Sequence, residues 1–265
     1  MMFGLRLGDK PQLIITTTPR PTEIILNLVK RNGVDVHLTQ GNTFENDANL
    51  AESALKQLRE RYAGTRLGRQ ELYAELLQDI EGALWSYGFL ERSRIQKDSL
   101  PELERIVVAI DPAVTASEDS DETGIIVAGK GFDNRYYIVD DCSVRMSPDG
   151  WGRLAIDMFY KYQADRIVAE VNNGGDLVEG LLRNIDNTVP YTPVRASRGK
   201  LVRAEPIAAL YEQGKVSHVG MFKELEDQLC SYSPTSKKSP DRLDALVWAL
   251  TELSQSTGKA YWRIS

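Results

Sequence analysis

Three acidic residues stand where apolar neighbours make a charge costly. Asp111 ends the run Ile-Val-Val-Ala-Ile-Asp, Glu170 lies in the run Ile-Val-Ala-Glu-Val, and Asp244 opens the apolar helical stretch Ala-Leu-Val-Trp-Ala-Leu. A buried carboxylate costs free energy unless a positive charge compensates it, and a bound divalent cation is one such compensation. Since Mg²⁺ and Mn²⁺ prefer carboxylate oxygens, we predict that Asp111, Glu170 and Asp244 bind divalent metal.

Each acid also has a local interpretation that involves no metal. Asp111 precedes Pro112 and would start a turn. Glu170 would be a paired acid at a strand end, and Asp244 would be a helix N-terminal acid stabilised by the helix dipole. Asp241 lies one helical turn before Asp244, so it is either a further metal ligand or the start of the helix.

The composition is that of a globular protein without a membrane segment. Of 265 residues, 42% are hydrophobic and 26% are charged, and no apolar run approaches the roughly 20 residues of a membrane span. The N-terminus lacks the apolar segment of a secretory signal. Cys142 and Cys230 lie far apart and are expected to be reduced thiols, and two histidines leave little material for a zinc site.

The net charge of −6 argues against a protein that coats nucleic acid electrostatically. The acidic excess falls after residue 100, because residues 1–100 carry 13 basic and 13 acidic side chains. Basic residues do gather locally. A group that would suit either a DNA backbone or an ordinary solvated loop consists of Arg195, Arg198, Lys200 and Arg203.

The polar, proline-bearing segment near residue 98 predicts a boundary between residues 1–97 and 98–265. In the first part we expect strands at 12–18 and 34–39 and helices at 22–31, 49–63 and 67–80. In the second part we expect strands at 105–111, 123–130, 135–142, 166–171, 189–195 and 215–219. Helices are expected there at 148–163, 174–186, 202–213, 221–230 and 241–255.

This order predicts an α/β fold with a mixed β-sheet flanked by helices. Asp111 and Glu170 end strands that can be neighbours at the centre of the sheet, and Asp244 arrives on the last helix. Sites in open α/β sheets form where adjacent strands send their connections in opposite directions. We therefore expect the three acids to converge although they are distant in the sequence.

Several motifs occur in an order that is typical of one family. They are Val108–Ala113, Asp121–Ile125, Ile167–Gly175 and Ser239–Ala249, preceded by Leu13–Pro21 and by Arg69–Leu72 with Glu81–Trp85. The order resembles the large terminase subunit of tailed bacteriophages and prophages. The later motifs resemble its ribonuclease H-like nuclease domain, and Leu13–Pro21 resembles the coupling motif that closes its ATPase core.

The resemblance implies a Mg²⁺- or Mn²⁺-dependent endonuclease that cuts concatemeric double-stranded DNA by a two-metal-ion mechanism. Asp111 would bridge two ions, Glu170 would hold one and Asp244 the other, while Lys200 would contact the DNA backbone or the scissile phosphate. Residues 1–97 would be a small α/β remnant of the ATPase domain with linker helices. The implied partners are the small terminase subunit, the portal protein and an ATPase region, in the cytoplasm of the host cell.

ATP hydrolysis is not expected from this chain, because Gly199-Lys200 is followed by Leu201 and no Walker A loop occurs. A non-catalytic prophage remnant, or a module that docks on the portal or motor, is the alternative function. An actin-like ATPase is disfavoured, since residues 113–122 contain no glycine and too much negative charge to bind phosphates. Junction resolvases and transposases share the acids but do not account for residues 1–97.

Overall fold

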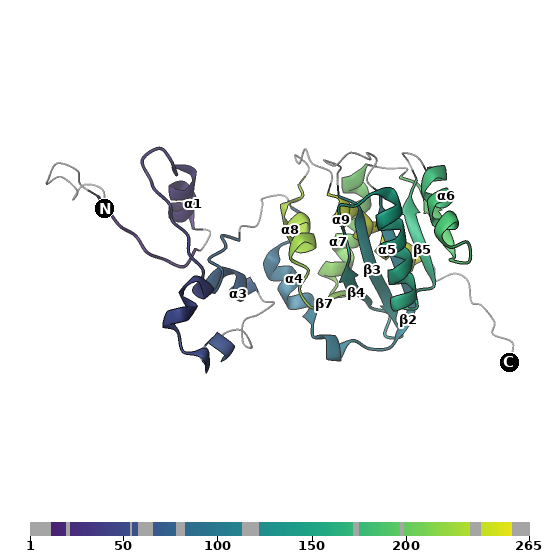
Figure 1. Ribbon diagram of the computed structural model, residues 1–265, viewed down its shortest axis with the longest axis horizontal. Coiled ribbons are helices and arrows are strands. Elements are labelled where there is room, and N and C mark those ends of the chain that lie inside the picture. The colour runs from purple at the N-terminus through teal and green to yellow at the C-terminus, as the bar shows by residue number, and fades with distance from the viewer. Residues whose placement is uncertain are drawn as a thin grey trace. The chain divides into compact units, whose positions relative to one another are not determined.

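The computed structural model describes residues 12–19, 22–53, 55–57, 66–77, 83–112, 122–171, 175–196, 199–233 and 240–255. The chain divides into two compact units, Met1–Gln78 and Asp79–Ser265 (Figure 1). The elements of the first unit are α1 (Glu23–Lys30), the 3-10 helix η2 (Thr43–Asn49) and α3 (Arg66–Glu71).

The helices predicted in the first unit are found in part. The helix expected over 22–31 is confirmed by α1. Residues 52, 53 and 55–57 of the next predicted helix are helical, and residues 54 and 58–63 lie outside the described residues. The helix expected over 67–80 is too long, because α3 ends at Glu71 and the backbone at Ala74 has a φ of 52°, which a right-handed helix does not adopt.

Both strands predicted in the first unit are wrong. Residues 12–18 form no strand, and Ile14 is 87% exposed. Residues 34–39 contribute only the isolated bridge between Val36 and Asn32. Apolar and β-branched side chains favour extended backbone, but a strand needs a partner strand to satisfy its hydrogen bonds. Within the part of this unit that the structure describes, no partner strand is present.

The second unit is built on a seven-stranded sheet with strand order β1-β7-β4-β3-β2-β5-β6. Strand β3 runs antiparallel to β2 and β4, whereas the other adjacent pairs are parallel. The expected mixed sheet is therefore confirmed. The strands are β1 (Arg94–Ile95), β2 (Leu103–Asp111), β3 (Gly124–Gly131), β4 (Tyr136–Asp141), β5 (Arg166–Glu170), β6 (Tyr191–Val194) and β7 (Val216–Val219).

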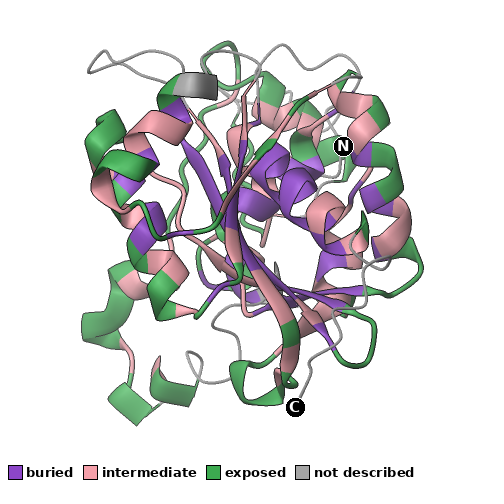
Figure 2. Ribbon diagram, turned by 90° about the vertical axis from the view of Figure 1, so that its right-hand side faces the viewer, coloured by how far each residue is buried: buried purple, intermediate pink, exposed green. Residues whose placement is uncertain are grey.

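Helices cover both faces of the sheet, so that each face has its own apolar core (Figures 1 and 2). Alternation along β2 puts Val107 and Ala109 in one core and Val108 and Ile110 in the other. One face packs against α5 (Pro148–Lys161) and α6 (Gly175–Ile185). The other packs against α4 (Tyr87–Ser93), α7 (Lys200–Glu212), α8 (Lys223–Ser231) and α9 (Asp241–Gln255).

The elements predicted after the boundary are confirmed to within a few residues. The hairpin between β3 and β4, the alternating strands and helices after α5, and α9 over 241–255 all occur where the sequence predicts them. The sequence did not reveal α4, β1 or the short 3-10 helix η3 (Lys97–Ser99). Strand β1 has only two residues, too few to show a periodic pattern.

The boundary between the units lies between Gln78 and Asp79, earlier than the predicted boundary at 97/98. Trp85 and Leu90 are buried in the core beneath α7, α8 and α9. Strand β1 extends the sheet by pairing with β7. The polar segment near residue 98 is thus a loop within the second unit, and the stretch before it contributes core residues.

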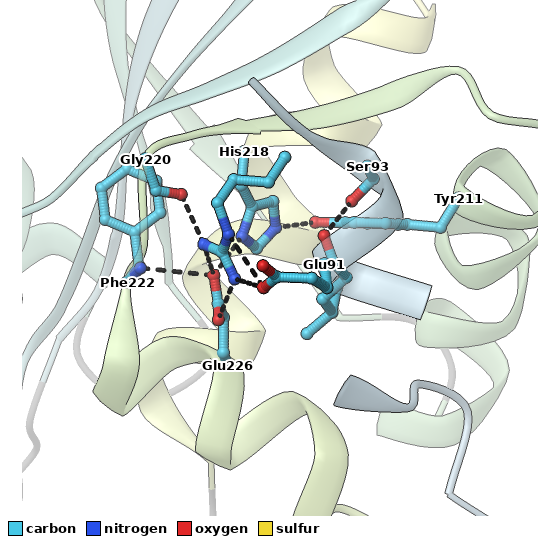
Figure 3. Close-up of polar contacts among 9 residues, drawn as sticks. Glu91, Ser93, Tyr211, His218, Gly220, Phe222 and Glu226 are labelled. Carbon is cyan, nitrogen blue, oxygen red and sulfur yellow. Dashed lines mark hydrogen bonds and ion pairs between the residues drawn. The ribbon is translucent and has the colours of Figure 1, made fainter. Parts of the chain in front are cut away.

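A cluster of buried and half-buried polar side chains fixes β1 to the sheet edge (Figure 3). We call it the edge cluster, and it consists of Glu91, Arg94, Tyr211, His218 and Glu226. Arg94 donates to both oxygens of Glu226, at 2.7 and 3.0 Å. His218 contacts Glu226 through Nδ1 at 3.1 Å and the Tyr211 hydroxyl through Nε2 at 2.7 Å. The cluster therefore connects β1, α7, β7 and α8.

The helices that the structure describes include none long and apolar enough to cross a membrane. The longest of them, α9, has 15 residues, whereas a membrane-spanning helix needs about 20.

Candidate metal-binding nuclease site

Asp111 and Glu170 lie at equivalent positions of two parallel neighbours. In the pairing of β2 with β5, Ile110 is opposite Ala169, so the next residues along the two strands are Asp111 and Glu170. Each acid follows its strand's alternation onto the face that carries Ala109 and Val168 in the core beneath α9. The predicted convergence of the two strand ends is therefore found, and both acids share the sheet face that α7 and α9 cover.

Helix α9 brings Asp244 to the same place, where it is 1% exposed. The close approach depends on Gly124, which pairs with Asp111 across β2 and β3. A Cβ atom at Gly124 would lie 2.1 Å from the backbone oxygen of Asp241, so any side chain there would push α9 away. The glycine thus allows the first turn of α9, with Asp241 and Asp244, to lie against the end of β2.

The N-terminus of α9 is held by side chains from other elements. Gln228 of α8 accepts from the backbone N–H groups of Arg242 and Leu243 at 3.0 and 3.3 Å. The Arg242 guanidinium donates to both oxygens of Glu122, at 2.6 and 2.7 Å, and to Asp141 at 2.6 Å. The Gln228 bonds satisfy backbone donors that a helix start leaves open. Together with the Arg242 ion pairs, they fix the position from which Asp244 reaches the site.

Helix α7 contributes two basic side chains to the site. Lys200 Nζ forms an ion pair with Asp244 Oδ2. One turn later, Arg203 reaches Glu170 Oε2 through Nη1 at 3.4 Å and Asp244 Oδ1 through Nη2 at 3.3 Å. Arg203 therefore bridges an acid on the sheet and an acid on α9.

Trp248 supports both Glu170 and Arg203. Its indole Nε1 donates to Glu170 Oε2 at 2.8 Å, and the Arg203 guanidinium lies 4.5 Å from the centre of its ring. The sequence analysis missed this residue. The signal was available, because Trp248 lies four residues after Asp244 and residues at this spacing share one face of a helix.

The electrostatic environment of the site is unusual for acids. Burial raises the pKa of Asp111 to about 8, assisted by the negative charges of Asp244 and Glu170. Burial also raises the pKa of Asp244, against the opposing effect of Lys200. The pKa of the Lys200 ammonium is raised by its carboxylate partners despite burial. The acids thus exceed the bases that accompany them, and Asp111 is the acid that remains uncompensated.

The donor set suits Mg²⁺ or Mn²⁺, since it consists of carboxylate oxygens around an excess of negative charge. Among the described residues, however, no group of three or more acidic, His or Cys side chains is gathered closely enough to hold one ion. Both oxygens of Asp244 face the cations of Lys200 and Arg203. The carboxylates must therefore turn from these partners if they are to bind a metal ion together.

The structure places the other predicted residues as follows. Asp241 is half-buried and is close enough to raise the pKa of Asp111. Arg195 is exposed beyond the end of β6. Arg198 lies outside the described residues. Arg203, which the sequence analysis grouped with residues that would suit either a DNA backbone or a solvated loop, lies against the acids with its side chain 11% exposed.

Solved structures with a similar chain trace include terminase structures of low sequence identity. The large terminase nuclease from thermophilic phage G20c is 18% identical, with 56% of this chain and 82% of that chain covered and a TM-score of 0.44. The large terminase from another thermophilic bacteriophage, in complex with ADP, is 12% identical, with 78% and 52% covered and a TM-score of 0.49. The human cytomegalovirus terminase nuclease domain, soaked with Mn and inhibitor-bound, is 14% identical, with 64% and 95% covered and a TM-score of 0.49. The chain spans about half the length of the ADP-bound large terminase.

No curated protein matches the chain. A family model for the terminase RNaseH-like domain, however, matches residues 108–253. The match runs from β2 to α9 and includes Asp111, Glu170 and Asp244. The ribonuclease H-like fold that the resemblance implied is thereby confirmed. The chain belongs to the family of terminase RNaseH-like domains.

Proposed function

We propose that this chain is a metal-dependent endonuclease that cuts concatemeric double-stranded DNA during viral genome packaging. The observation that carries the proposal is the convergence of Asp111, Glu170 and Asp244 from three separate elements. Burial, assisted by the charges of Asp244 and Glu170, raises the pKa of Asp111 to about 8, so an ionised Asp111 would gain from a bound cation. Membership of the terminase RNaseH-like family supports the same function.

Two divalent cations about 3.5–4 Å apart would supply an activated water and would neutralise the charge that develops on the scissile phosphate. Asp111, whose pKa responds to both other acids, is the residue that would contact both ions. Glu170 would hold one ion from the sheet and Asp244 the other from α9. Trp248 holds one oxygen of Glu170 at 2.8 Å and so limits the directions in which this carboxylate can turn.

Lys200 is the basic residue best placed to meet the DNA backbone. Its side chain is 36% exposed although its ammonium group pairs with Asp244. An ammonium group that is exposed beside an acid site can contact a phosphate on the open side without leaving the acid. The exposed Arg195 would add a backbone contact further from the acids.

The first unit is proposed to be the end of an ATPase region, as its motif Leu13–Pro21 suggests. Double-stranded DNA is the proposed substrate. The small terminase subunit, the portal protein and an ATPase region are the proposed partners.

Cleavage of supercoiled plasmid tests the proposal. The wild-type chain should nick and linearise plasmid in Mn²⁺ or Mg²⁺ but not in EDTA. We expect Asp111→Ala to lower the rate more than about 100-fold, because even groups that only support metal ligands are worth about 10–100-fold. Asp149→Ala is the matched control, since this acid is exposed in an ion pair with Arg153 on α5 and should leave cleavage unchanged.

The opposite result has a defined meaning. If neither the wild type nor Asp111→Ala cleaves plasmid, and calorimetry shows no Mn²⁺ binding, the proposal is contradicted. The non-catalytic docking module would then be the better account of the fold.

A further inference from the structure

Arg203 holds a position between two of the proposed metal ligands. Its guanidinium spans Glu170 and Asp244 at 3.4 and 3.3 Å, stacks 4.5 Å from the centre of the Trp248 ring, and is largely buried. Stacking and burial keep the group in place, because leaving would require the side chain to pass out from between α7 and α9. Arg203 is therefore a built-in cation of the site rather than a mobile surface side chain.

The charge of Arg203 is permanent and only partly compensated. A guanidinium does not lose its proton in a protein. Its two contacts to the carboxylates are long for charge-assisted hydrogen bonds, which are usually about 2.7–2.9 Å. Its Nε is buried and has no hydrogen-bond partner within the described parts of the chain. Arg203 therefore still presents positive charge to anything that enters beside the two acids.

This charge opposes a metal ion that binds without DNA. When Asp111, Glu170 and Asp244 are all ionised, as metal binding requires, these three acids carry −3, and Lys200 and Arg203 reduce their total to −1. Two divalent cations would change that total to +3, and a site with this surplus repels the second ion. A phosphodiester supplies a negative charge at the same place, so that metal and DNA relieve each other's repulsion.

We propose that Arg203 is an internal counter-cation that weakens metal binding to the DNA-free site and thereby makes metal occupancy depend on the DNA phosphate. This inference rests on the proposed nuclease function and adds a control of when the site is loaded. Because coupling is reciprocal, metal binding in turn strengthens DNA binding. A motor protein that carries a nuclease would thus avoid a fully loaded site before DNA is present.

A purely positioning role for Arg203 predicts the opposite result. If the guanidinium only held Glu170 and Asp244 in place, its removal would let the acids move and would weaken metal binding. If it acts as a counter-cation, its removal strengthens metal binding in the absence of DNA. The sign of the change in Mn²⁺ affinity therefore separates the two roles.

The test measures Mn²⁺ binding to the full chain by calorimetry without DNA. We expect Arg203→Gln, which removes the charge, to bind Mn²⁺ about tenfold or more tightly than the wild type. Arg203→Lys, which keeps the charge, should bind within about threefold of the wild type. Arg203→Met provides a second neutral side chain if the glutamine variant does not fold.

Arg105→Gln is the matched control. Arg105 of β2 pairs at 2.7 Å with Glu252 of α9. Glu252 lies near the C-terminal end of this helix, whereas Asp244 lies near its N-terminal end. This variant also loses one ion pair on α9, and its Mn²⁺ affinity should equal that of the wild type. A tightened affinity in the control as well would show a general effect of charge and would overturn the specific role of Arg203.

Cleavage supplies a second readout. In the wild type, the Mn²⁺ concentration for half-maximal plasmid cleavage should lie well below the dissociation constant measured without DNA. In Arg203→Gln the ratio of the dissociation constant without DNA to the half-maximal Mn²⁺ concentration should be about tenfold lower than in the wild type. Neutral variants that bind Mn²⁺ as weakly as the wild type, or more weakly, would overturn the inference.

Failure of the proposed function would look different. In that case Asp111→Ala would bind Mn²⁺ as the wild type does and neither protein would cleave DNA. If wild-type binding is too weak to detect, detectable binding by Arg203→Gln supports the counter-cation role, and undetectable binding by both contradicts it.

Discussion

Two ionic clusters of the second unit, the edge cluster and the proposed metal site, lie on the same side of one sheet and differ in how their charges balance. In the edge cluster, Arg94 donates twice to Glu226, and hydrogen bonds from His218 and Arg94 lower the pKa of Glu226 to about 2 despite burial. At the proposed metal site, burial and two neighbouring acids raise the pKa of Asp111 to about 8. Similar residue types in similar burial thus shift the pKa of an acid in opposite directions.

The difference distinguishes a cluster that stabilises the fold from one that is proposed to bind metal. A buried acid with strong hydrogen-bonded partners is complete within the protein, and loss of one partner leaves a charge that nothing else neutralises. A buried acid with too few partners requires something from outside, and strongly raised acid pKa values gather at functional sites. The balance of partners therefore separates the two clusters better than the number of charged residues does.

The largest expected effect is on the edge cluster. Arg94→Met should lower the free energy of unfolding by about 3–5 kcal/mol, because it leaves the Glu226 carboxylate buried without its guanidinium. Urea unfolding at pH 7 measures the change. Arg153→Met is the control, since its pair with Asp149 is more than half exposed and should contribute no more than about 1 kcal/mol. Equal losses in the two variants would contradict the distinction between a buried and an exposed pair.

A smaller effect with a defined pH dependence is expected at Asp111. Its folded pKa of about 8 lies above its ordinary value of 3.8, so the folded state binds the proton more tightly than the unfolded state. Below its ordinary pKa, Asp111 is protonated in both the folded and the unfolded state, and the free energy of unfolding is not reduced by this group. As the pH rises from there towards 8, only the unfolded state loses the proton readily, so the free energy of unfolding falls. In EDTA, the wild type should therefore lose about 2 kcal/mol relative to Asp111→Asn between pH 6 and pH 8.

Glu226→Gln sharpens this comparison. Glu226 has a folded pKa of about 2 and an ordinary value of 4.5, so it is ionised in both states throughout pH 6–8. Its removal should change stability by the same amount at both pH values, although the loss itself is large. The measurement is urea unfolding of the three proteins at the two pH values. Parallel pH curves for the wild type and Asp111→Asn would contradict the raised pKa of Asp111.

The sequence predicted the second unit well because its signals are local and regular. The apolar runs that end at Asp111 and Glu170 carry the strand pattern and the acids together, so the strand ends and the convergence followed from one observation. Asp244 followed from the pattern of α9. What remained hidden depends on contacts between elements. The bridging position of Arg203 arises from the packing of α7 against α9, which no spacing in the sequence reveals.

The first unit shows the limit of the same reasoning. Residues 12–18 have the composition of a buried strand, yet Ile14 is 87% exposed. The composition of a segment indicates the backbone conformation that it favours when other elements bury it. It does not indicate whether such elements are present. The division between the compact units lies earlier than the predicted boundary for a related reason, since Trp85 and Leu90 are buried against helices more than a hundred residues later.

The smallest effect concerns the hydrogen bond from Trp248 to Glu170. Trp248→Phe keeps most of the ring beneath Arg203 but removes the donor that lies 2.8 Å from the carboxylate. Trp85→Phe is a matched control, because Trp85 is equally well buried and its indole nitrogen has no hydrogen-bond partner among the described residues. Both variants lose similar volume, so a larger cost for Trp248→Phe, by about 1 kcal/mol in urea unfolding, measures the hydrogen bond itself.

The functional consequence should follow the same difference. If Trp248 orients Glu170 for a metal ion, Trp248→Phe should lower plasmid cleavage and weaken Mn²⁺ binding, whereas Trp85→Phe should change neither. The two tryptophans pack on the same side of the sheet, and only one of them donates to an acid of the site. Equal costs and equal cleavage in the two variants would mean that this donor contributes nothing to the position of the Glu170 carboxylate.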